Sequence, residues 1–188
     1  MSIDTVPSIY DYCPFCAGKL GTRIEEEKPR QHCEHCNWTY YPHVAASVSA
    51  IIEDLGAVLL VKRLHEPFKG TWMFPSGFVD FGEHPDEALE REVNEETGLK
   101  VRDCDLLGVY QSPDDYREPG HFVFFYRVKA GGGELRTDPH ENEDIRWFPI
   151  GSEMPSVGWK LHSHFLSLIW KLGSSTLVRG RAFKQTAP

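Results

Sequence analysis

Three glutamates in one short segment are the side chains of this sequence with the clearest capacity for chemistry. Glu92, Glu95 and Glu96 are spaced i, i+3 and i+4, so on an α-helix they fall within an arc of about 100°. Leu89 and Val93 lie on the same side of that helix. The spacing therefore predicts that the acids border the face that packs on a core, where burial disfavours their charged forms.

Such a cluster needs compensating positive charge. Carboxylates about 5 Å apart repel by roughly 3 kcal/mol per pair at an effective dielectric constant near 20. Arg91 lies four residues before Glu95, but one arginine cannot balance three acids and Glu83. Divalent cations prefer carboxylate oxygens and can do so. The alternative is an exposed acidic stripe held by ion pairs, and the apolar neighbours of these acids argue against it.

Four of the five cysteines form a second group with metal-binding potential. Two Cys-x-x-Cys pairs, Cys13 with Cys16 and Cys33 with Cys36, are separated by sixteen residues. This spacing is typical of a zinc site with four sulfur ligands, which leaves no open position for a water and is structural. Two disulfides are the alternative, which a reducing compartment disfavours. Because some 30 residues bury little core, we expect chelation to unfold residues 10–42 and leave the rest mostly folded.

Length and composition limit the classes of function. The chain has 188 residues, 40% of them hydrophobic, and a formal net charge of −8. This balance indicates a globular protein and argues against broad nucleic-acid binding, so metal ions or a few placed cations must meet an anionic substrate. No apolar run approaches the ~20 residues of a membrane helix, and the start has no secretory pattern. We therefore expect a cytoplasmic protein that does not engage membranes.

Signals along the chain predict the elements that position these groups. Pro85 at the first helical position and Gly98 just past the end predict a helix over 85–97, with His84 as its N-cap. A second helix over 161–172 should pack on the core. Residues 131–133 read as a flexible turn, and the tail from Gly173 as loosely ordered. Strands are predicted at 44–53, 57–63, 101–110, 122–128 and 145–150, with a short extended piece around Trp72.

The segment around the glutamates resembles a known family signature. It reads Gly77-x5-Glu83-x7-Arg91-Glu92-Val93-x-Glu95-Glu96-x-Gly98-Leu99, which is similar to a complete Nudix box. The resemblance implies an α/β fold, the Nudix α/β/α sandwich with a mixed sheet, behind a small zinc ribbon. It also implies Mg²⁺ or Mn²⁺ on the box acids and hydrolysis of a nucleoside diphosphate linked to another moiety.

The resemblance also implies roles for single residues. Glu92, Glu95 and Glu96 would bind the metal together with the carbonyl of Gly77, and Arg91 would pair with the box acids. Outside the box, Glu141 lies in a segment that resembles the acid-bearing loop before the family's final strand. It would be a further metal ligand or the general base, a role that Glu92 has in some members. Two neighbours of Glu141 could take the same role, namely Glu143 and Asp144.

The N-terminal segment resembles the zinc ribbon of the NADH pyrophosphatase branch of this family. Residues 109–116 stand where that branch carries Ser-Gln-Pro-Trp-Pro-Phe-Pro-x-Ser, and the array is absent. ADP-ribose or another ADP-linked compound is therefore at least as well supported as NADH. Trp72, Phe78 and Tyr110 could stack on adenine, with packing as the alternative for each. Lys62 and Arg63 could contact phosphate or form a solvated strand end.

Together these features predict a zinc ribbon over 1–42, a Nudix domain over 43–150, and a C-terminal helix and tail over 151–188 packed on it. The partner should be a nucleotide-derived small molecule, and a homodimer would be common for the family. Two alternatives stay open. The domain could be a Nudix-fold binding module without turnover, or the ribbon could bind nucleic acid and guide the enzyme to an RNA end.

Overall fold

A computed structural model of the chain describes residues 10–172. The chain divides into two compact units, with the boundary between His43 and Val44. The first unit contains one antiparallel hairpin, β1 (Gly21–Glu25) and β2 (Lys28–His32). Among residues 10–43 only Cys13, His32 and Cys33 are buried. This unit therefore has almost no apolar core of its own.

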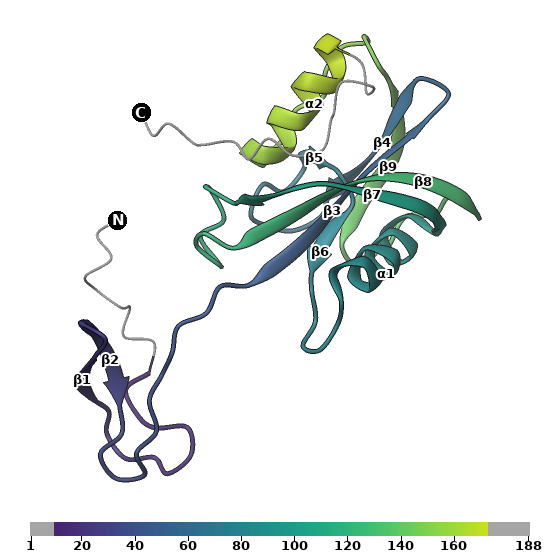
Figure 1. Cartoon of the computed structure of the whole chain (residues 1–188). Coiled ribbons are helices and arrows are strands. Elements are labelled where there is room, and N and C mark those ends of the chain that lie inside the picture. The colour runs from purple at the N-terminus through teal and green to yellow at the C-terminus, as the bar shows by residue number, and fades with distance from the viewer. Residues whose placement is uncertain (1–9, 173–188) are drawn as a thin grey trace. The chain divides into compact units, whose positions relative to one another are not determined.

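The second unit is built on a seven-stranded mixed sheet (Figure 1). Strands β3 and β8 pair in parallel, and the other pairs are antiparallel. The strands are β3 (Ala46–Asp54), β4 (Ala57–Arg63), β5 (Trp72–Met73), β6 (Ser76–Phe78), β7 (Leu99–Gln111), β8 (Phe122–Gly133) and β9 (Asn142–Pro149).

The central strand β3 has different neighbours at its two ends. Its last residues, Glu53 and Asp54, pair with β4 in a tight hairpin. Its first half pairs instead with the short strand β6, so that Val48 lies opposite Gly77. Strand β8 runs along the other edge of β3. Because β4 diverges from β3 after the hairpin, β6 can enter the sheet, and this brings the glycine of the box beside the central strand.

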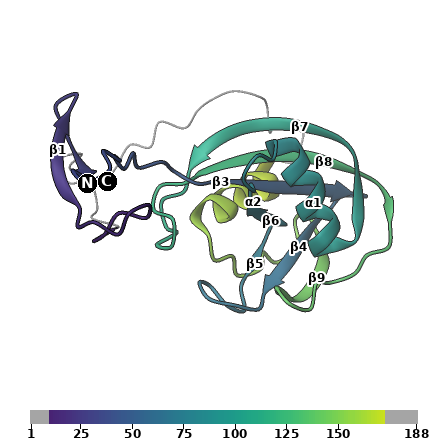
Figure 2. The same ribbon diagram turned by 90° about the horizontal axis from the view of Figure 1, so that it is seen from below.

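Two helices cover opposite faces of this sheet, α1 (Pro85–Thr97) and α2 (Lys160–Leu172) (Figures 1 and 2). Alternate residues of β3 separate two cores, because successive side chains of a strand point to opposite faces. Val48 and Ala50 pack with α1, whereas Ile51 packs in the cluster that contains Phe165 of α2. The predicted α/β/α sandwich with a mixed sheet is confirmed.

The predicted helix over 85–97 is confirmed at both ends. His84 accepts a hydrogen bond from the backbone N–H of Asp86, and the Glu87 side chain accepts one from the N–H of His84. Gly98 ends the helix in the left-handed conformation, with φ of 72°, which glycine adopts without steric cost. Local capping chemistry fixes both ends of this helix.

The strand predictions are confirmed with shifted ends, and one prediction is wrong. Residues 131–133 do not form a flexible turn but complete β8, where Gly133 pairs with Leu99. A Cβ added at Gly133 would overlap the carbonyl oxygen of Gly98. Glycine is therefore present here for close approach to the end of α1. The predicted loose tail from Gly173 lies outside the described residues, and neither helix of the described chain has the length and apolarity of a membrane span.

Candidate functional site

The acids of α1 differ in their exposure. Glu92 and Glu96 are buried, with 8% and 2% of their surface exposed, whereas the Glu95 side chain is 54% exposed. The prediction that all three avoid water therefore fails for Glu95. That residue lies at the edge of the arc, one position before Glu96, where the helix turns out of the protein.

Arg91 holds several of these acids in place. Its Nε and Nη2 donate to the two carboxylate oxygens of Glu83, both at 2.9 Å, and its Nη1 donates to Glu92 at 2.6 Å and to Glu95 at 3.2 Å. Nη2 also donates to the carbonyl of Phe78. Through this last bond the arginine ties the helix to strand β6. Hydrogen bonds from Arg91 lower the pKa of Glu83 to about 2.

Glu96 lies deepest in the cluster. One carboxylate oxygen accepts from the backbone N–H of Ser76 at 2.7 Å, and the other accepts from Nδ2 of Asn142 at 3.3 Å. No basic side chain in the described chain pairs with it. Asn142 is itself 4% exposed and was not identified from the sequence, where an asparagine beside three acids carries no distinct signal. The buried Glu96 carboxylate is therefore stabilised by two uncharged donors, the backbone N–H of Ser76 and the side-chain amide of Asn142.

Gly77 is placed against Glu92 so closely that no side chain fits. A Cβ added at this glycine would overlap the carboxylate of Glu92. The glycine of the box therefore allows the carboxylate to reach the backbone of β6. The carboxylates of Glu92 and Glu96 therefore both lie against the backbone of β6.

The electrostatics of this volume disfavour negative charge. Burial raises the pKa of Glu92 to about 7, with Glu141 and Glu95 adding to the rise and Arg91 opposing it. Burial also raises the pKa of Glu96 far above its usual range, and the charges of Glu92 and Glu141 raise it further. The set of hard oxygen donors and the unfavourable mutual repulsion both fit a site for divalent cations.

The structure brings Glu141 to the same place. It directly precedes β9, and its carbonyl accepts from the N–H of Leu64 at 2.9 Å. The adjacent carbonyl of His140 lies 2.7 Å from Nε2 of His65. The pairing of β9 with β4 therefore positions the loop. The two alternatives to Glu141 form ion pairs elsewhere, Glu143 with Lys62 at 2.9 Å and Asp144 with Arg146 at 2.5 Å.

A cavity of about 480 Å³ opens beside these acids. Its lining includes Gly77, Glu92, Glu96 and Glu141, so four of the five predicted ligands of Mg²⁺ or Mn²⁺ share one space, and Glu95 is not among the lining residues. The other part of its wall carries both signs of charge: Arg63 and Arg117 lie there with Phe78, Trp159 and His162, and so do the acids Glu66, Asp114 and Asp115. The cavity thus presents an acidic cluster and cationic side chains to the same occupant.

The basic part of the wall alternates rings and guanidinium groups. The guanidinium carbon of Arg117 lies 6.0 Å from the ring centroid of Phe78 and 5.6 Å from that of Trp159. Arg63 lies 5.6 Å from the same indole. Asp115 accepts both Nε and Nη2 of Arg117, at 3.0 and 2.8 Å. Of these cavity residues, only Phe78 and Arg63 were identified from the sequence.

The other two aromatic candidates do not line the cavity. Trp72 packs edge-on against Phe148, with ring centroids 4.7 Å apart. Tyr110 packs against Phe125 and Phe165 in the core under α2. Both side chains thus follow the packing alternative, because the strands that carry them turn these positions toward α2.

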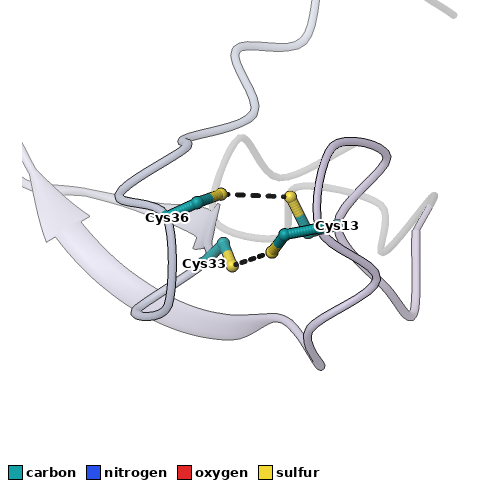
Figure 3. Close-up of side chains that lie close together, drawn as sticks. Cys13, Cys33 and Cys36 are labelled. Carbon is teal, nitrogen blue, oxygen red and sulfur yellow. Dashed lines mark hydrogen bonds between the residues drawn. The ribbon is translucent and has the colours of Figure 1, made fainter.

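The cysteines of the first unit form a separate cluster (Figure 3). Their four Sγ atoms lie within 4.8 Å of one another, and the Cys13–Cys36 and Cys16–Cys33 pairs are both 3.5 Å apart. All are free thiols, so the disulfide alternative is not realised. A zinc ion with sulfur ligands at about 2.3 Å would give sulfur separations near 3.8 Å. The geometry therefore fits a tetrahedral site with little adjustment.

Comparison with known proteins gives the same class as the fold and the box. The sequence profile of the NUDIX domain matches residues 41–168. The chain therefore belongs to the Nudix family. The matched region begins near the boundary of the second unit and includes the first turns of α2.

Curated relatives include two kinds of hydrolase. The chain is 45% identical over 105 residues to the ADP-ribose pyrophosphatase of Methanocaldococcus jannaschii, covering 55% of this chain and 61% of that protein. It is 28% identical over 158 residues to the NAD-capped RNA hydrolase NudC of Chromobacterium violaceum, covering 81% and 57%. The alignments thus span about three fifths of each of these relatives.

Solved structures show the same fold. A NUDIX hydrolase from Nitrosomonas europaea superposes with a TM-score of 0.76 at 22% identity, covering 92% of this chain and 97% of that one. The NUDIX domain of NrtR from Shewanella oneidensis, solved with ADP ribose, gives a TM-score of 0.58 at 22% identity, covering 68% and 86%. At these identities the likeness concerns the fold alone.

Proposed function

We propose that the protein is a metal-dependent hydrolase that cleaves the diphosphate of a nucleoside diphosphate linked to another moiety and releases a nucleoside monophosphate. The convergence of Glu92, Glu96 and Glu141 on one cavity carries the proposal. A binding module without turnover has no need of buried acids whose charged forms are disfavoured. The similarity to an ADP-ribose pyrophosphatase and to NudC proteins supports the same class of reaction.

Glu92, Glu95, Glu96 and Glu141, with the carbonyl of Gly77, would hold Mg²⁺ or Mn²⁺. Bound there, divalent ions supply neutralisation of the diphosphate charge and a water of lowered pKa. Arg91 keeps Glu92 and Glu95 in the geometry that binding requires. Glu141 is exposed, and its side chain has no partner among the described residues, so it is available to take the proton from the attacking water, with Glu92 as the alternative base.

ADP-ribose is the substrate that the observations support best. The chain lacks the array of the NADH pyrophosphatase branch, and its cavity offers Phe78 and Trp159 as ring surfaces. The test is a panel of ADP-ribose, NADH and other ADP-linked compounds with Mg²⁺ or Mn²⁺, read by release of AMP. No release from any member would refute the assignment.

A second candidate, cleavage at a capped RNA end, has one observation in its favour. Alignments with NudC proteins cover up to 81% of the chain and so extend into the first unit. That unit carries a group of neighbouring rings, Tyr10, Trp38 and Tyr40. Adding NAD-capped RNA to the panel tests this candidate, and RNA binding that weakens steeply with salt and needs residues 10–42 would support it.

We further propose that the four cysteines hold a structural Zn²⁺. Burial raises the pKa of Cys13, but N–H groups of Phe15 and Cys16 outweigh it and bring the pKa to about 7, whereas hydrogen bonds with the neighbouring thiols raise the pKa of Cys16 and bring that of Cys36 to about 12. Without an ion the cluster therefore favours one thiolate, and a bound cation would favour the others. Such thiols require a reducing compartment, which supports the predicted cytoplasmic location. Elemental analysis should find about one zinc per chain, and its absence from protein made with adequate zinc would refute the site.

A further inference from the structure

The helix α2 sends one polar side chain into the core beside the cavity. His162 is only 6% exposed, and its ring stacks on Phe74 with centroids 5.5 Å apart and meets Phe125 edge-on. It also lines the cavity that holds the acids. Buried polar groups are normally hydrogen-bonded, so each ring nitrogen of His162 is expected to have a partner.

Hydrogen bonding fixes the protonation state of this histidine. Nδ1 of His162 accepts from the backbone N–H of Phe74 at 3.1 Å. The ring must therefore be neutral at Nδ1 and carry its single proton on Nε2. Burial, together with the nearby charges of Arg63 and His121, lowers the pKa of His162 to about 3, in agreement with a neutral ring. Within residues 10–172, Nε2 has no hydrogen-bond partner.

The surroundings of Nε2 indicate what it binds. Arg63 is close enough for its charge to act on His162, and it also lines the cavity. Arg63 uses Nε on the carbonyl of Pro67 and Nη1 on the sulfur of Met73, which leaves Nη2 available. A neutral N–H and a guanidinium are both donors and offer no acceptor. Such a pair suits an anionic oxygen better than a hydroxyl, which would also need to donate.

We propose that Nε2–H of His162, together with Arg63, binds a phosphate oxygen of the substrate and so makes α2 part of the substrate site. The proposal rests on the proposed function in that the phosphate belongs to the diphosphate cleaved at the acids. The fixed tautomer gives a donor that is present at every pH above the titration of the ring. Because His162 packs against Phe74 and Phe125, changes in that part of the core would also change the affinity for the phosphate.

The sharpest test is His162→Asn. Asparagine can still accept from the N–H of Phe74 at the position of Nδ1, but it does not reach the position of Nε2. We expect a folded protein with a lowered thermal midpoint, because the ring contacts with Phe74 and Phe125 are lost. We also expect a loss of ADP-ribose affinity of about tenfold to a hundredfold, the usual size of a hydrogen bond to a charged group. The loss should appear in KM, and also in calorimetric titration of protein that has been dialysed free of Mg²⁺ and Mn²⁺ and keeps its zinc. Adenosine, which has no phosphate, should show no loss.

His164→Asn on the same helix is the matched control, because His164 does not line the cavity. It should bind ADP-ribose like wild type. A folded His162→Asn protein with wild-type affinity would overturn the proposal, and so would metal-free wild-type protein that binds no ADP-ribose at millimolar concentration. Loss of affinity in a protein that cleaves nothing on the panel would refute the proposed hydrolysis and leave this inference standing.

Wild-type protein provides a second measurement that does not depend on folding of a variant. The nitrogen resonances of the His162 imidazole should show a neutral ring with its proton on Nε2. Addition of inorganic pyrophosphate should shift the Nε2 resonance and leave the nitrogens of His164 unchanged. An Nε2 resonance that stays in place at saturating pyrophosphate would contradict the proposal.

Discussion

Each of the two units of this protein holds a cluster of closely spaced ligand atoms, but only one of the clusters is attached to a hydrophobic core. The acids Glu92 and Glu96 are attached to a helix that packs on a sheet through Leu89 and Val93, both fully buried. The four cysteines belong to a unit whose buried described residues are Cys13, His32 and Cys33. The acids are thus held in place by a hydrophobic core, whereas the cysteines have almost no core around them.

This difference determines what a metal contributes to each unit. Around the acids, the core already provides the folding free energy, so the cluster can remain unfavourable without a metal, as the proposed catalytic site requires. Around the cysteines, a bound metal replaces the missing core and provides folding free energy directly. Crowded ligand atoms that destabilise the folded protein therefore indicate an active site. Crowded ligand atoms whose bound metal supplies the folding free energy indicate a structural site.

Removal of zinc should give the largest effect. Structural zinc contributes about 10–16 kcal/mol in small zinc-dependent folds, so a strong chelator should unfold residues 10–42. Amide hydrogen exchange should show loss of protection at β1 and β2 and retention at β3 and β8. Loss of protection in both units together would contradict the comparison, because it would mean that the sheet also depends on the metal.

Glu96→Gln should have the next largest effect, and on activity alone. The variant loses a carboxylate that is proposed to hold the divalent ion, so kcat should fall by orders of magnitude. The thermal midpoint should stay or rise, because glutamine does not have to be held uncharged on burial as Glu96 does, and Asn142 can turn its amide to present oxygen. Glu90→Gln, an exposed acid of the same helix, is the control and should leave both quantities unchanged. Full activity of the Glu96 variant would refute the site.

The sequence predicted what local chemistry determines. Pro85, His84 and Gly98 define α1 without help from the rest of the fold, and the spacing of the acids on it follows from helical geometry. Asn142, Arg117 and Trp159 reach the cavity from three segments that only tertiary structure brings together. A sequence pattern has no information on such convergence.

The aromatic candidates also show that sequence alone does not determine which residues reach the cavity. Residue type suggested that Trp72, Phe78 and Tyr110 could stack on a base, and only Phe78 lines the cavity. The face that a strand residue presents depends on register, which is set by pairing between strands distant in sequence. Sequence could therefore supply candidates for a ring surface but could not select among them.

Gly77→Ala should show how tightly the core-supported cluster is built. The new methyl group would overlap the Glu92 carboxylate, so either the acid or β6 must move. Overpacking of this kind costs about 1–3 kcal/mol, measurable by denaturant unfolding, and activity should fall as Glu92 is displaced. Gly21→Ala in β1 is the control, since the nearest atom to its new methyl is 4.0 Å away. Equal unfolding free energies for Gly77→Ala and wild type would show that the close contact between residue 77 and the Glu92 carboxylate does not require glycine.

The pH dependence of stability should separate the two kinds of acid in the box. In metal-free protein the pKa of Glu92 is raised to about 7, so the folded state binds more protons than the unfolded state from about pH 4.5 upward. The unfolding free energy should therefore decrease as the pH rises from about 4.5 to 7, by on the order of 3 kcal/mol for this residue. Glu96 shifts in the same direction and should extend the decrease to higher pH.

Glu83 should behave in the opposite sense, because Arg91 lowers its pKa to about 2. Its contribution to stability is complete above pH 4.5 and is lost as the pH falls toward 2, a window that does not overlap that of Glu92. Denaturant unfolding between pH 4.5 and 8, in protein dialysed free of Mg²⁺ and Mn²⁺ without a chelator, should show the decrease in wild type, and Glu92→Gln should flatten it below pH 7. Mg²⁺ should also flatten it, since an ion that binds only the folded, ionised cluster stabilises the folded state. A flat wild-type profile without Mg²⁺ or Mn²⁺ would mean that water reaches these carboxylates, and the contrast between the two clusters would then be lost.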